Sequence, residues 1–228
     1  MVHFDISIRL RYKRHMESLK KKRARTKTIF ETLDPLYTRE KTALKYQNPF
    51  QLLVATILSA QCTDVQVNRV TKTLFKKYKG PKDYLRAPIS ELENDIRSTG
   101  FYKNKAKSIK GSAQAVMDLF EGKVPSTMEE MLKLPGVGRK TANCVLGAVF
   151  DVPGVVVDTH VKRLANRLGL SDNQDPDKIE KDIERLLPEK RWRRFSDILI
   201  YHGREYCMAR KPAHDRCPIY KHCPSRSI

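Results

Sequence analysis

The stretch LPGVGRKTANCVLGAVF, residues 134–150, decides the fold. Gly136 and Gly138 follow Pro135 at two-residue spacing, and glycine permits positive φ angles and a close approach by another backbone. The residues after Gly138 have helical period, so the first amides of that helix point outward as donors for an anion such as a DNA phosphate. An ordinary tight turn between packed helices fits the same residues. In both interpretations the stretch joins two helices through a hairpin.

Two residues in and after this hairpin carry chemistry. Lys140 lies at the start of the second helix, where the helix dipole and the adjacent Arg139 disfavour the charged form. Such a lysine is either an amine nucleophile that attacks a sugar C1′ and forms a Schiff base, or a simple phosphate contact. Asp158, in VVVDTHVKRLANRLGL, is expected to cap the helix that follows it. A carboxylate held by amides can also stabilise an oxocarbenium-like sugar.

Most of the remaining chain also has helical period. NPFQLLVATILSAQ begins with Asn48 as the expected N-cap, and Ser126 with Glu129 predicts a capping box before TMEEMLKL. The only β-like run is GVVVD, residues 154–158, which is better interpreted as a buried extended connector than as part of a sheet. The fold class is therefore all-α, with about nine or ten helices.

The charge balance indicates the class of partner. The 228 residues include 45 Lys and Arg against 26 Asp and Glu, a net charge of +19, which attracts polyanions and favours nucleic acid. Residues 1–28 hold ten basic and two acidic residues, a local balance of +8, and are either a solvated tail or an arm that follows DNA. No apolar run approaches the length of a membrane span, and a soluble, intracellular monomer without membrane contact is expected.

Soft metal ligands are concentrated near the C-terminus. Donors of this type occur at intervals of six, two and five residues, at Cys207, His214, Cys217 and Cys223. This spacing is typical of a four-ligand metal site, and it fits a reducing compartment better than a disulfide framework. Cys62 and Cys144 occur singly in helical patterns and are interpreted as small buried residues.

Several motifs in order resemble the endonuclease III family of helix-hairpin-helix DNA glycosylases, and the similarity covers about residues 30–225. They are ILSAQCTD, LPGVGRKTA, VDTHV and HGREYCMARKP. The resemblance implies a two-domain all-α fold with DNA in a cleft between the domains. A six-helix domain at 42–152 would contain the hairpin, and residues 29–41 with 153–228 would form the domain of both termini and the metal cluster. Residues 1–28 would be a basic N-terminal extension.

The resemblance also implies the activity. The expected protein is a bifunctional DNA glycosylase and AP lyase that binds double-stranded DNA containing a damaged base or an abasic site and flips an oxidised pyrimidine out of the duplex. Lys140 would form the Schiff base that leads to β-elimination, with Asp158 assisting base release. The alternatives are a monofunctional mismatch or uracil glycosylase and a non-catalytic redox module that binds damaged DNA. The expected location is the nucleoid in a prokaryote and the nucleus in a eukaryote.

DNA contacts are likewise implied by the resemblance. Gln61 would enter the gap left by the flipped nucleotide, and Phe101, in STGFYKNKA, would be an apolar wedge between base steps. A position of Phe101 in the core is the alternative. The other implied contacts are Gly136, Val137, Gly138, Arg139, Thr159 and His160.

The metal site departs from the family at one position. The family's tail carries four cysteines at these spacings and binds a [4Fe–4S] cluster, whereas this chain has His214 at the second position. Three outcomes stay open: a cluster with three cysteines and His214 as ligands, a Cys₃His zinc site, or a labile or lost site, natural or engineered. The inferred cluster stiffens a loop in which Arg210 and Lys211 approach phosphate.

Overall fold

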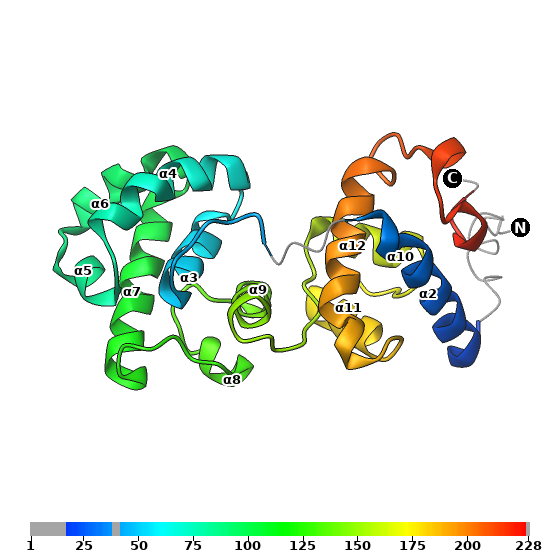
Figure 1. Cartoon of the computed structure of the whole chain (residues 1–228), viewed down its shortest axis with the longest axis horizontal. Helices are drawn as coiled ribbons and strands as arrows, with labels where there is room; N and C mark the ends of the chain where they lie inside the picture. The colour runs from blue at the N-terminus through cyan, green and yellow to red at the C-terminus, as the bar shows by residue number, and fades with distance from the viewer. Residues whose placement is uncertain (1–16, 38–41, 227–228) are drawn as a thin grey trace, which may run out of the picture. The chain divides into compact units, whose positions relative to one another are not determined.

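The computed structural model describes residues 17–37 and 42–226, and these residues form an all-α protein, as expected. The chain divides into a terminal unit, Met1–Tyr37 with Thr159–Ile228, and a central unit, Thr38–Asp158 (Figure 1). Residues 1–16 of the expected basic extension lie outside the described residues, and residues 19–28 belong to the first described helix. The segment 153–158 belongs to the central unit by its contacts.

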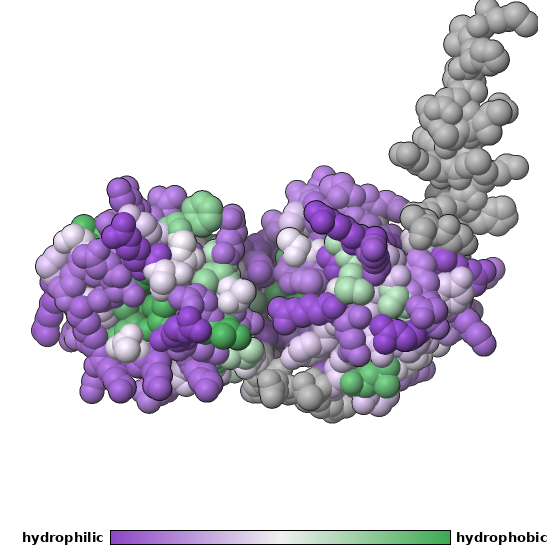
Figure 2. Space-filling view, turned by 90° about the horizontal axis from the view of Figure 1, so that it is seen from above, coloured by the Kyte–Doolittle hydropathy of each residue, from purple (hydrophilic) through white to green (hydrophobic). Residues whose placement is uncertain are grey.

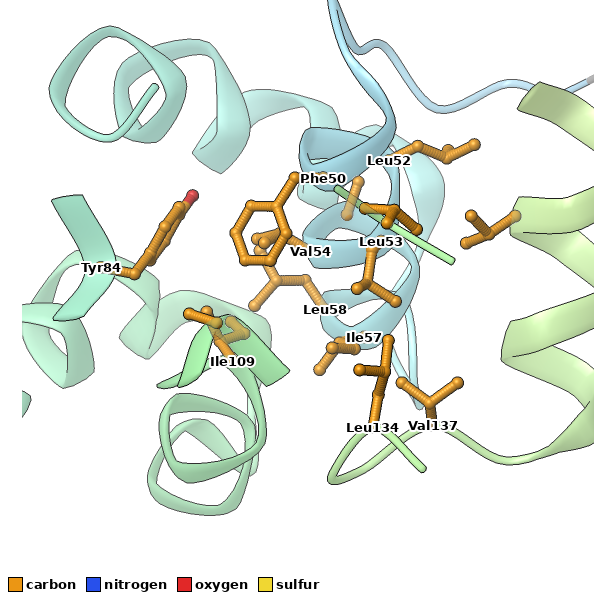
Figure 3. Close-up of a cluster of buried hydrophobic side chains, with 14 of the residues drawn as sticks. Phe50, Leu52, Leu53, Val54, Ile57, Leu58, Tyr84, Ile109, Leu134 and Val137 are labelled. Carbon is orange, nitrogen blue, oxygen red and sulfur yellow. The ribbon is translucent and has the colours of Figure 1, made fainter. Parts of the chain in front are cut away.

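The central unit is built around one buried helix. Its helices are α3 (Pro49–Leu58), α4 (Asp64–Lys77), α5 (Pro81–Arg86), α6 (Ile89–Ile96), α7 (Tyr102–Phe120), α8 (Met128–Met131) and α9 (Arg139–Val149). Every residue of α3 after Pro49 is buried, because α4, α7 and α9 all pack against it. Figure 3 shows Phe50, Leu53 and Ile57 of α3 at the centre of this core, with the hairpin residues Leu134 and Val137 beside Ile57.

Local signals explain where these helices begin. The Asn48 side chain accepts a hydrogen bond from the Gln51 amide at 2.9 Å, so Asn48 is confirmed as the N-cap of α3. The prediction of a capping box at Ser126 is wrong by one residue. Thr127 caps α8, and its hydroxyl lies 2.8 Å from the Glu130 carboxylate, because threonine supplies the same cap at the next position.

The eleven α-helices of the described residues exceed the expected nine or ten. One of them, the short α5, begins at a Gly-Pro pair that is typical of turns. Gly80 is the N-cap of α5 and Pro81 its first residue, a position where proline loses no hydrogen bond. The extended connector is confirmed: residues 151–158 have no regular structure, and Gly154–Val157 are buried.

The terminal unit joins the two ends of the chain. Its helices are α2 (Leu19–Leu33), α10 (Thr159–Arg167), α11 (Pro176–Glu184) and α12 (Trp192–Glu205), followed by the 3-10 turns His214–Arg216 and Tyr220–His222. Arg194 of α12 pairs with Asp34 at 2.6 Å, and Arg25 of α2 donates to the Leu168 carbonyl at 2.7 Å. These contacts attach α2 to the C-terminal half within one unit.

The exposed surface is mainly polar. Figure 2 shows hydrophilic residues over most of one face, with hydrophobic residues in small separate patches. None of the helices in residues 17–37 and 42–226 combines the length and apolar character needed to cross a membrane.

Candidate functional site

The hairpin between α8 and α9 is fixed to α7. The Ser112 hydroxyl, fully buried, donates to the Pro135 carbonyl at 2.8 Å. At Gly111 the same helix leaves no room for a side chain, since a Cβ there would lie 2.9 Å from the Pro135 Cβ. Val137 inserts its side chain into the core. Interactions on both sides therefore hold the hairpin backbone in one position.

The two glycines of the hairpin have different roles. Gly136 has a φ angle of 77°, and a Cβ at this position would lie 2.4 Å from the Ser108 side chain. Gly138 has an ordinary φ angle of −93° and is the N-cap of α9, with no atom within 4 Å of the place of a Cβ. Gly136 is thus required by backbone conformation and packing. Gly138 leaves the first amides of α9 open to an approaching anion.

Alanine substitutions should separate these roles. Gly136→Ala is expected to lower the free energy of unfolding by about 1–3 kcal/mol, because it adds backbone strain and a clash with Ser108. Gly138→Ala is expected to change it by less than about 1 kcal/mol, yet to weaken binding to duplex DNA because the methyl group obstructs the phosphate. Urea unfolding and fluorescence anisotropy measure the two effects. Equal losses of stability would contradict this division.

Lys140 is the second residue of α9, and its side chain is exposed. The hairpin fixes the backbone on one side of it, and the packing of α9 on α3 fixes it on the other. A ligand at the amides of this helix end can therefore reach the amine. Arg139, which precedes it, is half-buried.

The connector that ends at Asp158 is attached to the same helix. Asn143, one turn beyond Lys140, donates from Nδ2 to the Val155 carbonyl at 3.1 Å. Gly154 packs directly on this side chain, because a Cβ there would lie 2.4 Å from the Asn143 Oδ1. Asp158 is half-buried and immediately precedes α10. Thus α9 both carries Lys140 and holds the segment that leads to Asp158. That Asp158 caps α10 stays a prediction.

Four exposed residues of the central unit have left-handed backbones: Gln61, Phe101, Glu121 and Asp151. The first two are expected DNA contacts. Gln61 follows α3 with a φ angle of 53°, and Phe101 precedes α7 with a φ angle of 49°. Such a conformation costs about 1–3 kcal/mol in a residue other than glycine and is typical of binding and catalytic sites. The Phe101 side chain is 62% exposed, so the alternative that it belongs to the core is wrong.

The remaining expected DNA contacts differ in whether their backbone or their side chain is accessible. Val137 can offer only its backbone, since its side chain is 6% exposed. Thr159 is exposed at the start of α10, and the half-buried His160 has its Nδ1 3.1 Å from the Arg163 guanidinium. Both belong to the terminal unit, whereas the hairpin, Gln61 and Phe101 belong to the central unit.

The four expected metal ligands surround one cavity. Its volume is about 230 Å³, and its wall includes Cys207, His214, Cys217 and Cys223. In the part of the chain that the structure describes, no three His, Cys, Asp or Glu side chains are grouped as ligands of a single ion. Three thiols and an imidazole around a space larger than one ion fit a polynuclear iron–sulfur group.

The cavity wall is held by α10 and α12. Arg167 of α10 donates to the Cys207 Sγ at 3.3 Å and to the Met208 and Ala209 carbonyls at 2.7 Å each. His202 of α12 lies with Nε2 3.6 Å from the Cys217 Sγ. Burial raises the pKa of the Cys217 thiol, which is unfavourable for a nucleophilic cysteine but not for a metal-bound thiolate. The site suits metal binding.

Sequence reasoning missed three residues that organise these sites: Lys105, Asn143 and Arg167. Each acts through backbone carbonyls that are distant in sequence, at Leu58, Val155 and Met208 respectively. A single sequence contains no signal for such contacts, since the partner is a main-chain atom with no side-chain identity.

Comparison with known proteins identifies similar chains. Residues 54–189 match the family model of the HhH-GPD superfamily base excision DNA repair protein, and residues 207–223 match the iron–sulfur binding domain of endonuclease III. Endonuclease III of Synechocystis sp. is 48% identical over 211 residues, which cover 92% of this chain and 96% of that protein.

Two solved structures are similar over nearly the whole chain. A non-covalent endonuclease III–DNA complex has a TM-score of 0.85 at 40% identity, with 90% of this chain and 96% of that chain covered. A trapped endonuclease III–DNA covalent intermediate has a TM-score of 0.83 at 40% identity, with 92% and 98% covered. The agreement extends to both units of the fold.

Proposed function

The chain belongs to the endonuclease III family of base excision DNA repair proteins, and from this premise we propose how its residues carry out the two reactions. It is a bifunctional DNA glycosylase and AP lyase with an iron–sulfur domain, and DNA is its partner. The substrate proposed is duplex DNA with an oxidised pyrimidine or an abasic site.

Lys140 is the proposed nucleophile. Its amine forms a bond to C1′ of the damaged nucleotide while the bond from C1′ to the base breaks, and the base leaves with that electron pair and gains a proton. The amine loses a proton and the sugar ring opens to an iminium. Loss of a C2′ proton then expels the 3′ phosphate, and water hydrolyses the imine to release Lys140. Borohydride added during turnover would reduce the imine and leave the protein attached to DNA.

Asp158 is the proposed partner of Lys140 during base release. Its carboxylate stabilises the positive charge that develops on the sugar as the glycosidic bond breaks. The observation that carries this assignment is the hydrogen bond from Asn143 to the Val155 carbonyl, 3.1 Å long. That bond attaches the connector before Asp158 to the helix that bears Lys140. It supports a common site for the two groups.

The exposed residues before and after these elements are proposed to hold the DNA. The open amides after Gly138 bind a phosphate without reading sequence. Gln61 and Phe101 enter the duplex where the nucleotide is flipped out, and their exposed side chains on constrained backbones support that role. Thr159 and His160 are proposed as further contacts from the terminal unit.

The ligands of the iron–sulfur group are proposed to be Cys207, His214, Cys217 and Cys223. The family match at 207–223 and the single cavity that these residues line support a four-ligand cluster with histidine at the second position. When bound, the cluster organises the tail and takes no part in bond cleavage. The chain's own Arg167 holds the first ligand by its sulfur and by the carbonyls that follow it.

Iron content tests the role of His214. Protein purified without oxygen is expected to contain about four irons per chain. His214→Ala should lose most of this iron on exposure to air, because one iron lacks a protein ligand, whereas His214→Cys should retain it. His222→Ala, a matched change close to Cys223, should behave as wild type. Iron and zinc are measured by mass spectrometry and the cluster by visible absorbance. Stoichiometric zinc in the anaerobic protein would contradict the cluster assignment.

Localisation follows the substrate. The relative reported above is bacterial, and we place the protein on the chromosome of a bacterial cytoplasm. Fluorescence microscopy of a tagged chain should show it on the nucleoid.

A further inference from the structure

A buried lysine joins two loops of the central unit. Lys105, in the first turns of α7, has a side chain that is almost entirely buried, with the whole residue 5% exposed. Its Nζ donates to the Leu58 carbonyl at 2.8 Å and to the Thr99 carbonyl at 2.8 Å. No acidic partner takes part in these two bonds. Two main-chain carbonyl oxygens therefore stabilise the charge of the Lys105 ammonium.

The two carbonyls lie just before the residues proposed to enter DNA. Leu58 ends α3, three residues before Gln61, and Thr99 ends a 3-10 turn, two residues before Phe101. Carbonyls at a helix end lack intrahelical partners, and a lysine amine can satisfy them. One atom thus satisfies the ends of both segments and keeps their oxygens within two hydrogen-bond lengths of each other.

We infer that Lys105 is a positioning residue that sets the separation of Gln61 and Phe101 and so allows both to enter the duplex together. The inference rests on the proposed function of these two residues. Constrained placement is needed because both side chains must enter the same lesion, and a displacement of about 1 Å can cost 10²-fold in a reaction.

Other contacts near the two loops are weaker or exposed. Gln66 of α4 donates to the Ser98 hydroxyl at 2.9 Å, on the protein surface. Gly100, between Thr99 and Phe101, has a φ angle of 72° and no packing around the place of a Cβ. Lys105 is therefore the buried contact that holds the loop before Phe101 to the end of α3.

The same helix supplies a matched control. Lys110 is part-buried on α7 and donates to the carbonyls of Tyr84, Leu85 and Ala87, at 2.8, 3.0 and 2.6 Å. The first two carbonyls belong to the last turn of α5 and the third to the residue after that helix, away from both loops in sequence. Lys110→Met thus removes the same kind of interaction from the same helix without touching Gln61 or Phe101.

The test measures insertion into DNA apart from catalysis. A duplex with a tetrahydrofuran abasic analogue carries 2-aminopurine opposite the lesion, and fluorescence reports unstacking when protein binds. Lys105→Met is expected to lose most of the fluorescence rise and to weaken the preference for this duplex over undamaged DNA by about 10- to 100-fold. Lys110→Met is expected to keep both, even where thermal unfolding shows an equal loss of stability.

The outcomes separate the two proposals. Phe101→Ala and Gln61→Ala are measured in parallel, and if neither lowers the fluorescence rise, the insertion roles are wrong. If Phe101→Ala and Gln61→Ala lower the fluorescence rise but folded Lys105→Met does not, only the role of Lys105 is overturned. Should Lys105→Met not fold, Lys105→Gln takes its place, because its amide ends one atom short and cannot bond both carbonyls with the loops unmoved. A wild-type signal from that variant overturns the inference.

Discussion

Replacing Lys140 with glutamine is expected to abolish covalent trapping by borohydride on DNA that contains an abasic site. Strand cleavage should fall by at least about 10³-fold, because a neutral amide cannot form an imine with C1′. Binding to the tetrahydrofuran duplex should stay within about tenfold of wild type, since the open amides after Gly138 and the exposed Gln61 and Phe101 remain. Gel electrophoresis of the trapped adduct and single-turnover cleavage measure these effects.

Lys133→Gln is the control for this experiment. Lys133 is also exposed and lies just after α8, on the other side of the hairpin from Lys140. The Lys133→Gln variant should trap at the wild-type level, because it keeps the reacting amine of Lys140. Persistent trapping in Lys140→Gln would mean that another amine attacks the sugar and that Lys140 serves only to bind phosphate.

The parts of the site that depend on local sequence could be predicted. Proline and glycine at fixed offsets predicted the hairpin between α8 and α9, and the apolar run of residues 154–157 predicted a buried connector. Helix ends were harder. Serine and threonine are both favoured N-caps and stand side by side here, so the shift of the cap from Ser126 to Thr127 could not be foreseen.

The contacts that set the distance between loops were beyond the sequence. Lys105 lies beside Ala106 and Ile109 in a helical pattern, and nothing in that pattern distinguishes a buried ammonium from an exposed one. Asn143 is likewise an unremarked polar residue on α9 until Val155 is seen to accept its hydrogen bond. Both residues act on main-chain carbonyls, which every residue has, so the partner can be identified only in the fold.

The metal site contains one part that the sequence predicts and another that only the fold reveals. Ligand spacing predicted four donors in one place, and all four line the same cavity. The residues that contact these ligands could be identified only in the structure: Arg167 contacts the Cys207 sulfur, and His202 lies beside Cys217. Residues around metal ligands commonly tune affinity and orientation. The cavity wall can therefore accommodate histidine in place of cysteine at the second ligand position, because the contacts of Arg167 and His202 with the other ligands remain.

Asp158→Asn is expected to slow base release and strand cleavage to different extents. Removal of damaged pyrimidine should slow by about 10²- to 10³-fold, because the amide no longer offsets the charge that develops on the sugar. Cleavage at a preformed abasic site should slow by less than about tenfold, since no glycosidic bond breaks there and Lys140 supplies the imine. Single-turnover kinetics on a thymine glycol duplex and on an abasic duplex measure the two rates.

Asp151→Asn is the matched control, because it makes the same change at the other end of the connector. Asp151 is exposed with a φ angle of 54°, a conformation that asparagine adopts readily. The Asp151→Asn variant should release base and cleave the strand at wild-type rates on both substrates. If Asp158→Asn slowed both reactions equally while Asp151→Asn did not, Asp158 would act on Lys140 or on DNA placement rather than on the breaking bond. The hydrogen bond from Asn143 to Val155 would then serve to position the backbone before α10, and the charge of Asp158 would have no separate part in base release.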